Sequence, residues 1–335
     1  MSKFIKEFKE LTKKDVGIAG GKGASLGEMT NTKMPVPPGF VILASAFDRF
    51  LEETDMDVEV DAELKKINYN EMHSVSRASE VIRDLIYDQK MPEDIKKEIL
   101  SEFKKLKNAS FNKGPLRQSH SEARGVGGFY VAVRSSATAE DSSVASWAGE
   151  LESYLDTTEK MLLENVKKCW SSLFTPRAIF YRNEKKLLKT KVSVAVVVQK
   201  MIESEISGIC FTVHPVTEDK KQMIIEAGWG LGEAIVSGQI TPDAYVLDKR
   251  DFSIMDINIS KQEIMITRKP GGGVKTVAVP KAKQEKQVLN GKQIIELAKI
   301  CAGIEKHYKK PQDIEWAYAK GKFYIVQSRP ITTLG

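Results

Sequence analysis

The spacing of apolar residues changes part-way along the chain, and this change constrains the fold more than any other feature. Between residues 45 and 108, apolar side chains recur at helical spacing. After Lys191, short β-branched runs separated by glycine and proline predominate. Helices followed by strands predict an α+β protein. We therefore expect residues 1–190 to form a helix-rich first lobe and residues 191–335 a strand-rich second lobe.

These patterns predict individual elements. Three amphipathic stripes predict core-facing helices, formed by Ala46, Phe47, Phe50 and Leu51, by Val81, Ile82, Leu85 and Ile86, and by Ile95, Ile99, Phe103 and Leu106. Polar residues 108–128 predict a long loop, residues 129–133 a buried strand and residues 159–184 further helix. In the second lobe we expect strands at residues 192–198, 206–211, 223–226, 244–247, 264–267 and 274–279, then a helix over 291–308 and a hairpin.

Length, charge and cysteine content exclude several classes of protein. The 335 residues exceed the needs of one small core, and 41% hydrophobic with 29% charged residues is ordinary globular usage. The formal net charge of +6 suits anionic ligands but is far below the dense basic stripe of a nucleic-acid binder. Cys169, Cys210 and Cys301 form no disulfide framework or zinc-site spacing, which indicates a reducing compartment.

No segment is typical of a targeting signal or a membrane span. Residues 1–15 alternate lysines with apolar residues and lack the apolar stretch of a signal peptide. The longest apolar run, at residues 192–198, is too short to cross a bilayer. We therefore expect a cytoplasmic protein that binds no membrane.

A glycine-rich segment near the N-terminus is a candidate phosphate site. Gly20, Gly21 and Gly23 surround Lys22, just before a short helical start at residues 24–28. Glycines let backbone amides converge on an anion at a helix N-terminus, and Lys22 adds a mobile positive charge. The segment is not a Walker A loop, because Gly23 rather than Ser or Thr follows the lysine. An ordinary glycine turn is the alternative interpretation.

A strand that leads into a hydroxyl-rich loop is a stronger candidate. Arg134 ends the predicted strand and precedes Ser-Ser-Ala-Thr-Ala-Glu-Asp at residues 135–141. An arginine at a strand end is rigidly placed and can bind phosphate oxygens bidentately, with further donors from the hydroxyls after it. Gly149 beyond the loop allows close backbone approach. The alternative is that Arg134 pairs with Glu140 or Asp141 within the loop.

The C-terminal hairpin, with a tight turn at Lys320-Gly321, carries a candidate metal site. Gln327 and Arg329 share one face, because side chains alternate across a strand. Glu315 joins that face only if the loop holds an odd number of residues, as a three-residue loop with Gly321 in a left-handed conformation would. A carboxylate and an amide oxygen suit Mg²⁺. The alternative is a solvated polar face.

Two further segments and one histidine carry weaker signals. The valine-rich strand is followed by Gln199-Lys200-Met201-Ile202, where free backbone groups can hold an adenine edge, although Met and Ile are more typical of a core. Residues 226–233, Glu-Ala-Gly-Trp-Gly-Leu-Gly-Glu, predict a flexible connector and lack the dinucleotide-binding fingerprint. His214 precedes a proline in a predicted turn, where a structural role is expected.

Four segments stand in one order along nearly the whole chain: Gly-Gly-Lys-Gly-Ala-Ser-Leu-Gly-Glu-Met (20–29), Val-Pro-Pro-Gly-Phe (36–40), Val-Arg-Ser-Ser-Ala-Thr-Ala-Glu-Asp (133–141) and Gln-Ser-Arg-Pro (327–330). Together they closely resemble the N-terminal ATP-binding domain of the phosphoenolpyruvate synthase (pyruvate, water dikinase) family. The same domain occurs in pyruvate phosphate dikinase and rifampicin phosphotransferase. The serine loop looks like that of the synthase and rifampicin enzymes rather than that of the phosphate dikinases.

The resemblance implies an ATP-grasp fold that holds ATP in the cleft between two lobes. By position, it implies that Lys22, Arg134 and Arg329 contact the phosphates and are the catalytic residues. Gly149 lies in the loop over the triphosphate. The remaining implied contacts are Gln199 and Met201 at the adenine, Ser153 near the phosphates, and Glu315 with Gln327 on Mg²⁺.

The family passes a phosphoryl group from ATP to a histidine on a swivelling domain, which carries it to pyruvate on a barrel domain with release of AMP. The positioning and charge neutralisation that this chemistry needs suit Lys, Arg and Mg²⁺. No histidine here stands in a carrier motif. The resemblance therefore implies that the chain binds MgATP but needs the other two domains, in cis in a full-length enzyme or in trans, to complete the reaction.

One departure from the family and three alternatives stay open. Many relatives have Gly-Gln-x-x-Thr where this chain has Gly149-Glu150-Leu151-Glu152-Ser153; Ser153 keeps a hydroxyl, whereas Glu150 brings a negative charge to the phosphates. The acceptor is pyruvate in one interpretation and rifampicin in another. A stand-alone, non-catalytic ATP-binding module that docks on a partner is the second alternative. A nucleic-acid binder rests only on the mild positive charge.

Overall fold

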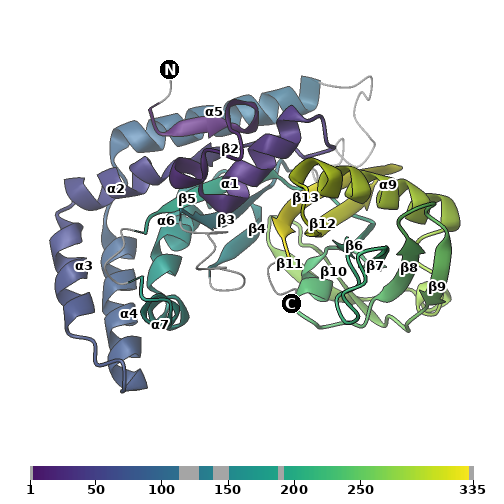
Figure 1. Ribbon diagram of the computed structural model, residues 1–335. Helices are drawn as coiled ribbons and strands as arrows, with labels where there is room; N and C mark the ends of the chain where they lie inside the picture. Colours follow the sequence, from purple (N-terminus) through teal and green to yellow (C-terminus); the bar gives the residue numbers. More distant parts are fainter. Residues whose placement is uncertain (1–2, 113–127, 139–150, 188–191, 332–335) are drawn as a thin grey trace. The chain divides into compact units, whose positions relative to one another are not determined.

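A computed structural model describes residues 3–112, 128–138, 151–187 and 192–331 of the chain (Figure 1). The chain divides into two compact units. Unit 1 comprises Met1–Glu28 and Pro38–Met201, and unit 2 comprises Met29–Pro37 and Ile202–Gly335. Helices and sheets are both abundant, which confirms the α+β class.

Unit 1 is built on a five-stranded antiparallel sheet in the order β1-β2-β5-β3-β4. Its strands are β1 (Ile5–Glu7), β2 (Gly39–Ile42), β3 (Val131–Ala137), β4 (Ser153–Thr157) and β5 (Val194–Lys200). Its helices are α1 (Val16–Asn31, ending in unit 2), α2 (Ala44–Glu53), α3 (Met56–Lys65), α4 (Met72–Asp88), α5 (Glu93–Asn112), α6 (Leu162–Ser171) and α7 (Pro176–Glu184), with 3-10 turns η1 (Phe8–Glu10) and η2 (Ser172–Phe174).

Helices cover one face of this sheet and form the core of unit 1 with it. Val133 and Val196 contribute from the sheet, while the ring of Trp170 on α6 lies 5.5 Å from Phe47 and 5.1 Å from Phe50, both on α2. The three predicted stripes lie on α2, α4 and α5, and nearly all their members face this core. Val81 is the exception at 36% exposure, because it lies on the outer side of α4.

Unit 2 contains a six-stranded antiparallel sheet in the order β13-β12-β6-β7-β8-β9 and a separate hairpin of β10 and β11. Its strands are β6 (Ile206–Phe211), β7 (Gln222–Trp229), β8 (Asp243–Asp248), β9 (Ile254–Asn258), β10 (Ile264–Arg268), β11 (Val274–Ala278), β12 (Gln312–Ala319) and β13 (Lys322–Pro330). Its helices are α8 (Glu233–Val236) and α9 (Gly291–Tyr308), with the 3-10 turn η3 (Lys281–Lys283).

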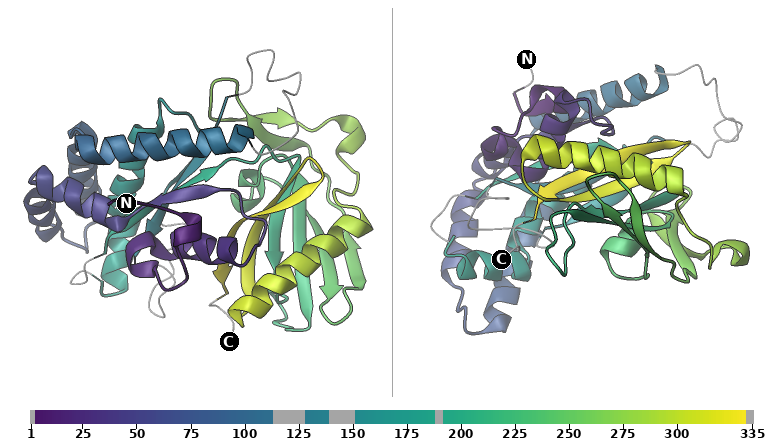
Figure 2. Two further views of the ribbon diagram at one scale, coloured as in Figure 1. Left: turned by 90° about the horizontal axis from the view of Figure 1, so that it is seen from above. Right: turned by 45° about the vertical axis from the view of Figure 1, so that its right-hand side comes forward.

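Helix α9 lies across one face of the six-stranded sheet (Figure 2). Its bounds coincide with the predicted helix, because Asn290 and Gln293 form a capping box in which each side chain accepts a hydrogen bond from the other's backbone N–H, at 3.0 and 2.9 Å. Leu297 and Cys301 are among the fully buried side chains on its inner side. The opposite face of the sheet carries the predicted metal ligands, the half-buried Glu315 and the buried Gln327.

Three sequence predictions need correction. The strand predicted at residues 129–133 begins at Val131 and runs on to Ala137, because Ser135 and Ser136 pair with β5 as strand residues. The predicted connector at residues 226–233 is strand β7 as far as Trp229. Helix α5 extends to Asn112, and the rest of the predicted loop at residues 108–128 lies almost wholly outside the described residues.

Within the described part of the chain, no helix combines the length and the apolar character that crossing a membrane requires.

Candidate functional site

The glycine-rich segment breaks α1 at Gly20, whose φ of 69° and ψ of 172° are not helical. The helix resumes immediately, so Lys22 lies in the first turn after the break rather than ahead of a helix that starts at residue 24. A Cβ on Gly20 would approach the side chain and backbone of Ser136 to 2.2–2.5 Å. Glycine is therefore required here both by the backbone conformation and by the close contact.

Ser136 joins the two predicted phosphate-binding segments. Its side chain is fully buried, donates a hydrogen bond to the backbone carbonyl of Ala19 at 2.9 Å and accepts one from the backbone N–H of Gly23 at 3.2 Å. Residues separated by more than a hundred positions are thereby held side by side. The segments that contain Lys22 and Arg134 therefore lie next to each other in unit 1.

Arg134 lies in the middle of β3 and is 9% exposed, not at a strand end as predicted. The hydroxyls expected to supply further phosphate donors are used inside the fold. Ser135 Oγ donates to the carbonyl of Glu152 at 2.8 Å and lies 2.9 Å from the hydroxyl of Ser172, and Ser136 holds α1. The alternative partners Glu140 and Asp141 lie outside the described residues, as do Gly149 and Glu150.

One face of the unit 1 sheet collects three of the predicted contacts. Arg134 stands opposite Ser153 on β4, and Gln199 on β5 stands opposite Ala132, two residues before Arg134 on the same strand. Because directly paired residues share a face and side chains alternate along a strand, Arg134, Ser153 and Gln199 lie on one side of the sheet. The valine-rich core is on the other side.

Gln199 carries an unsatisfied polar group on this face. Its side chain is 3% exposed, and its Nε2 has no hydrogen-bond partner among the described residues. Buried amides are almost always hydrogen-bonded in folded proteins, so this donor is a candidate to contact a bound ligand. Met201, just beyond β5, donates its backbone N–H to the carbonyl of Tyr130 at 3.0 Å.

A brace that sequence reasoning missed holds the start of β4. Arg83 on α4 donates from Nη2 to Glu152 Oε1 at 3.0 Å and to the hydroxyl of Tyr87 at 2.9 Å. The hydroxyl of Tyr154 donates to the other carboxylate oxygen of Glu152. Burial, together with this hydrogen bond, raises the pKa of the Tyr154 phenol, which therefore stays a donor. The brace positions Glu152, whose carbonyl accepts from Ser135 beside Arg134.

In unit 2, the hairpin brings Glu315 directly opposite Gln327. The predicted tight turn at Lys320-Gly321 is confirmed as a two-residue loop in which both residues have positive φ, at 52° and 76°, so the three-residue loop considered as a way to bring Glu315 to this face does not form. Glu315 reaches the face of Gln327 because a register shift adds one unpaired residue to the hairpin instead. Trp316 pairs with Ile325 while Glu315 pairs with Gln327, and the unpaired residue between them on β13 forms a β-bulge.

Arg329 is held by an ion pair that the sequence analysis did not anticipate. Its Nε and Nη2 donate to Asp313 Oδ2 at 2.9 and 2.7 Å across the same hairpin. Burial and the neighbouring Glu315 raise the pKa of Asp313, while Arg329 opposes that rise. The alternation of Asp313 and Glu315 along one strand was the signal that could have pointed to this acidic residue.

Glu226 on β7 extends this polar face. It pairs with Ile209, which in turn pairs with Glu315, so Glu226 and Glu315 face the same side two strands apart. Burial raises the pKa of Glu226, and the charge of Asp313 adds to that rise. Across the described ranges, no group of three or more His, Cys, Asp or Glu residues is arranged to hold a metal ion. Glu315 and Gln327 offer two oxygen donors of the kind that Mg²⁺ accepts alongside water.

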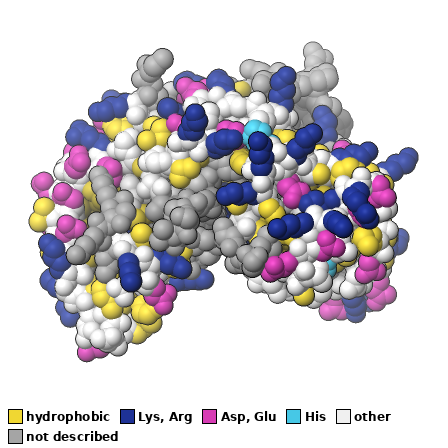
Figure 3. Space-filling model, in the orientation of Figure 1, with side chains coloured by type: hydrophobic (Ala, Val, Ile, Leu, Met, Phe, Trp, Pro, Cys, Tyr) yellow, Lys and Arg dark blue, Asp and Glu magenta, His cyan; other side chains and the backbone are white. Residues whose placement is uncertain are grey.

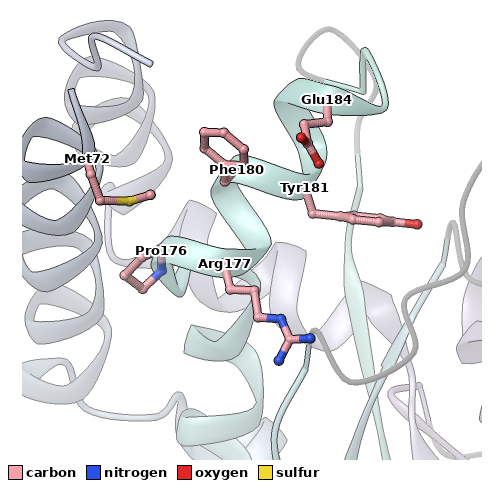
Figure 4. A pocket seen from close by; sticks show the side chains of 6 residues that line it. All are labelled: Met72, Pro176, Arg177, Phe180, Tyr181 and Glu184. Atoms are coloured by element: carbon pink, nitrogen blue, oxygen red, sulfur yellow. The ribbon is translucent and has the colours of Figure 1, made fainter. Parts of the chain in front are cut away.

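An apolar pocket in unit 1 lies elsewhere (Figure 4). It has a volume of about 390 Å³ and is bordered by Met72 on α4 and by α7 residues that include Phe180 and Tyr181. Arg177 and Glu184 are its charged members, and none of the predicted site residues lines it. Such a lining does not suit a triphosphate.

Comparisons with known proteins identify the family of the chain. Residues 16–335 match the family model described as "Pyruvate phosphate dikinase, AMP/ATP-binding domain". The chain belongs to this family. An AMP/ATP-binding domain of a dikinase accounts for the resemblance noted in the sequence, and it confirms the predicted family and the use of ATP.

Relatives with printed functions are similar over almost the whole domain. The chain is 46% identical to a "Probable phosphoenolpyruvate synthase" of Methanocaldococcus jannaschii, 44% to the "Phosphoenolpyruvate synthase" of Pyrococcus furiosus and 36% to the "Rifampicin phosphotransferase" of Bacillus subtilis. These alignments cover 99%, 99% and 100% of this chain but 27%, 44% and 36% of the relatives. The chain thus spans less than half the length of the relatives it matches.

Proposed function

We propose that this AMP/ATP-binding domain binds MgATP and supplies its phosphoryl group in a phosphoenolpyruvate synthase-type reaction. In that reaction ATP, pyruvate and water give phosphoenolpyruvate, AMP and phosphate. The observation that carries the proposal is that Arg134, Ser153 and Gln199 share one face of the unit 1 sheet. Hydrogen bonds of Ser136 join this part of the sheet to the segment that contains Lys22. An ATP-grasp fold, with one lobe over residues 1–190 and the other over 191–335, is part of the proposal.

The phosphates are assigned to basic side chains. Lys22 and Arg134 contact them from unit 1, with Gly149 in the loop above them and Ser153 beside Arg134. Arg329 contacts them from unit 2. Asp313 accepts two N–H groups of the Arg329 guanidinium, and this ion pair fixes the orientation of the group. These three cations neutralise charge that develops on the transferred phosphoryl group.

The adenine and the metal are assigned to the remaining residues. The orphaned Gln199 amide and the neighbouring Met201 border the base. Glu315 and Gln327, which face each other in the hairpin, would hold Mg²⁺ through their side-chain oxygens. When bound, the ion supplies positive charge next to the phosphate oxygens. Both residues are already placed by the β-bulge, so binding the ion needs no change of strand register.

The proposed partner domains are inferred from the length of the relatives. Because the chain spans only 27% and 44% of two phosphoenolpyruvate synthase relatives, we assign the phosphohistidine swivelling domain and the pyruvate-binding barrel to the remaining parts, in cis or in trans. Neither nucleic acid nor a membrane is needed, and the cytoplasm is the expected location. The similarity to the Bacillus subtilis enzyme keeps a rifampicin-type acceptor as the second candidate.

A complementation assay tests the proposal. The domain is mixed with the part of the Pyrococcus furiosus relative that the alignment leaves out, and AMP is measured with ATP, Mg²⁺ and pyruvate or rifampicin. AMP and phosphoenolpyruvate formation, lost with Arg134→Ala, supports the synthase reaction. AMP formation with rifampicin alone supports the second candidate. ATP binding without AMP, when the intact relative is active in the same assay, contradicts catalysis and favours a non-catalytic module.

A further inference from the structure

A second pocket lies in unit 2, beside the C-terminal end of α9, and unlike the apolar pocket of unit 1 it is strongly charged. It is a pocket of about 430 Å³, and its charged lining consists of Lys220, Lys249, Glu305, Lys306, Lys309 and Lys310. Five lysines against one glutamate give this lining a net charge of +4 at neutral pH. None of the residues assigned above to ATP or Mg²⁺ lines it.

The one acidic residue of the lining is already neutralised. Lys249 Nζ lies 2.7 Å from Glu305 Oε1 and 2.6 Å from Oε2, and it also donates to the backbone carbonyl of Thr212 at 2.7 Å. This half-buried ion pair neutralises the Glu305 carboxylate at the pocket wall. The other four ammonium groups have neither a hydrogen bond nor an ion pair with any described residue.

The helix dipole does not account for this set. Lys306 lies in the last turn of α9 and Lys309 caps it with a φ of 55°, positions where cations are favourable in any helix. Lys220, however, comes from the segment between β6 and β7, and Lys249 follows β8. Lysines from three separate parts of unit 2 therefore converge on one hollow. In Figure 3, Lys and Arg side chains gather over the region of α9.

We propose that this basic pocket binds a compact anion with two or more phosphate groups, such as a diphosphate, a triphosphate or a doubly phosphorylated metabolite. Four unpaired ammonium groups repel one another, and a multivalent anion relieves this repulsion better than a single phosphate does. Lysine supplies rotatable donors on a flexible stem, which suits clustered phosphate oxygens. The site is independent of the proposed nucleotide residues, and its failure would leave the proposed function intact.

Titration calorimetry with inorganic tripolyphosphate, at about 0.15 M salt to screen diffuse attraction, tests this site. The background is the Arg134→Ala chain, so that the proposed ATP site does not compete. We expect saturable 1:1 binding. Lys306→Ala with Lys310→Ala should weaken it at least about fivefold, since each removes a charge-assisted contact. Lys292→Ala with Lys299→Ala is the matched control, because both lysines are exposed on the same helix outside the pocket.

Each outcome decides the proposal. Weakening by the pocket pair, with less than about twofold change in the control pair, supports it. Equal weakening by both pairs shows attraction to net charge alone and overturns it. Absence of saturable binding, or binding that occurs in the unmodified chain and disappears with Arg134→Ala, also overturns it. Binding of a polyglutamate peptide with no response to tripolyphosphate would replace it by an acidic protein partner. Thermal unfolding of each variant verifies that the fold is retained.

Discussion

Glu315 lies directly opposite Gln327 in the β12–β13 ladder, although the turn that joins the strands contains an even number of residues. The bulge on β13 between Ile325 and Gln327 makes this pairing possible. Removing one residue from the register would send Glu315 and Gln327 to opposite faces, because side chains alternate with a period of two. Glu315 and Gln327 therefore lie on the same face only because of this bulge.

Glu315→Ala should weaken ATP binding at least about tenfold when Mg²⁺ is present and by much less when the metal is chelated, because the carboxylate acts through the ion. Titration calorimetry in the two conditions measures the difference. Glu296→Ala, an exposed glutamate on α9, is the control and should change neither value. Equal losses with and without Mg²⁺ would remove Glu315 from the metal site.

Gly20→Ala should destabilise the domain by about 1–3 kcal/mol, because a Cβ would overlap Ser136 and the φ of 69° is unfavourable for alanine. ATP affinity should fall as well, since the segment of Lys22 must move. Gly17→Ala on the same helix is the control, because its Cβ would meet nothing within 4 Å. Denaturant unfolding should show the control to be equal to or more stable than the parent. Equal destabilisation of both variants would contradict the close contact with Ser136.

Arg83→Ala should lower the affinity for ATP severalfold without touching the ligand, because it releases the Glu152 carboxylate beside Ser153. The unfolding free energy should also fall by about 1–3 kcal/mol, since a hydrogen-bonded carboxylate loses its partner. Lys96→Ala, which removes an exposed ion pair with Glu93, serves as the control. If the Arg83→Ala variant is fully folded and binds ATP as tightly as the parent, the brace has a structural role only.

The three cysteines should resist alkylation in the native state. All are buried, and burial raises the pKa of Cys169 to about 12. Burial also raises the pKa of Cys210, after the larger effect of its hydrogen bond with Cys301. Only the thiolate is nucleophilic, so at pH 8, well below its raised pKa, the Cys169 thiol stays protonated. A thiol-specific reagent should label none of them before denaturation and all three afterwards. Labelling of Cys169 in the native protein at pH 8 would show that its environment is open.

Local signals predicted the elements that the structure confirms. The α9 helix follows from its capping box, and α7 begins at Thr175 and Pro176 as expected, with Thr175 Oγ1 accepting from the Ala178 N–H at 3.1 Å. The stripes of α2, α4 and α5 follow from helical periodicity. Each of these features is encoded within a single continuous segment of the chain.

The parts that the sequence did not reveal depend on contacts between distant residues. Ser135 and Ser136 look like loop residues, yet pairing with β5 and contacts to Glu152 and Ala19 keep them in a strand. The ion pair of Asp313 with Arg329 depends on a strand register that includes a bulge. Both relationships arise only when separate segments meet, so local sequence cannot specify the partner of either residue.

The most direct test of the central claim is a calorimetric titration of ATP into this chain, with and without Mg²⁺, beside the Arg134→Ala variant. We predict saturable binding at one site that needs Mg²⁺ and falls at least about tenfold when the guanidinium is removed. Absence of saturable binding to the folded chain, or binding that Arg134→Ala leaves unchanged, would contradict the proposed nucleotide site.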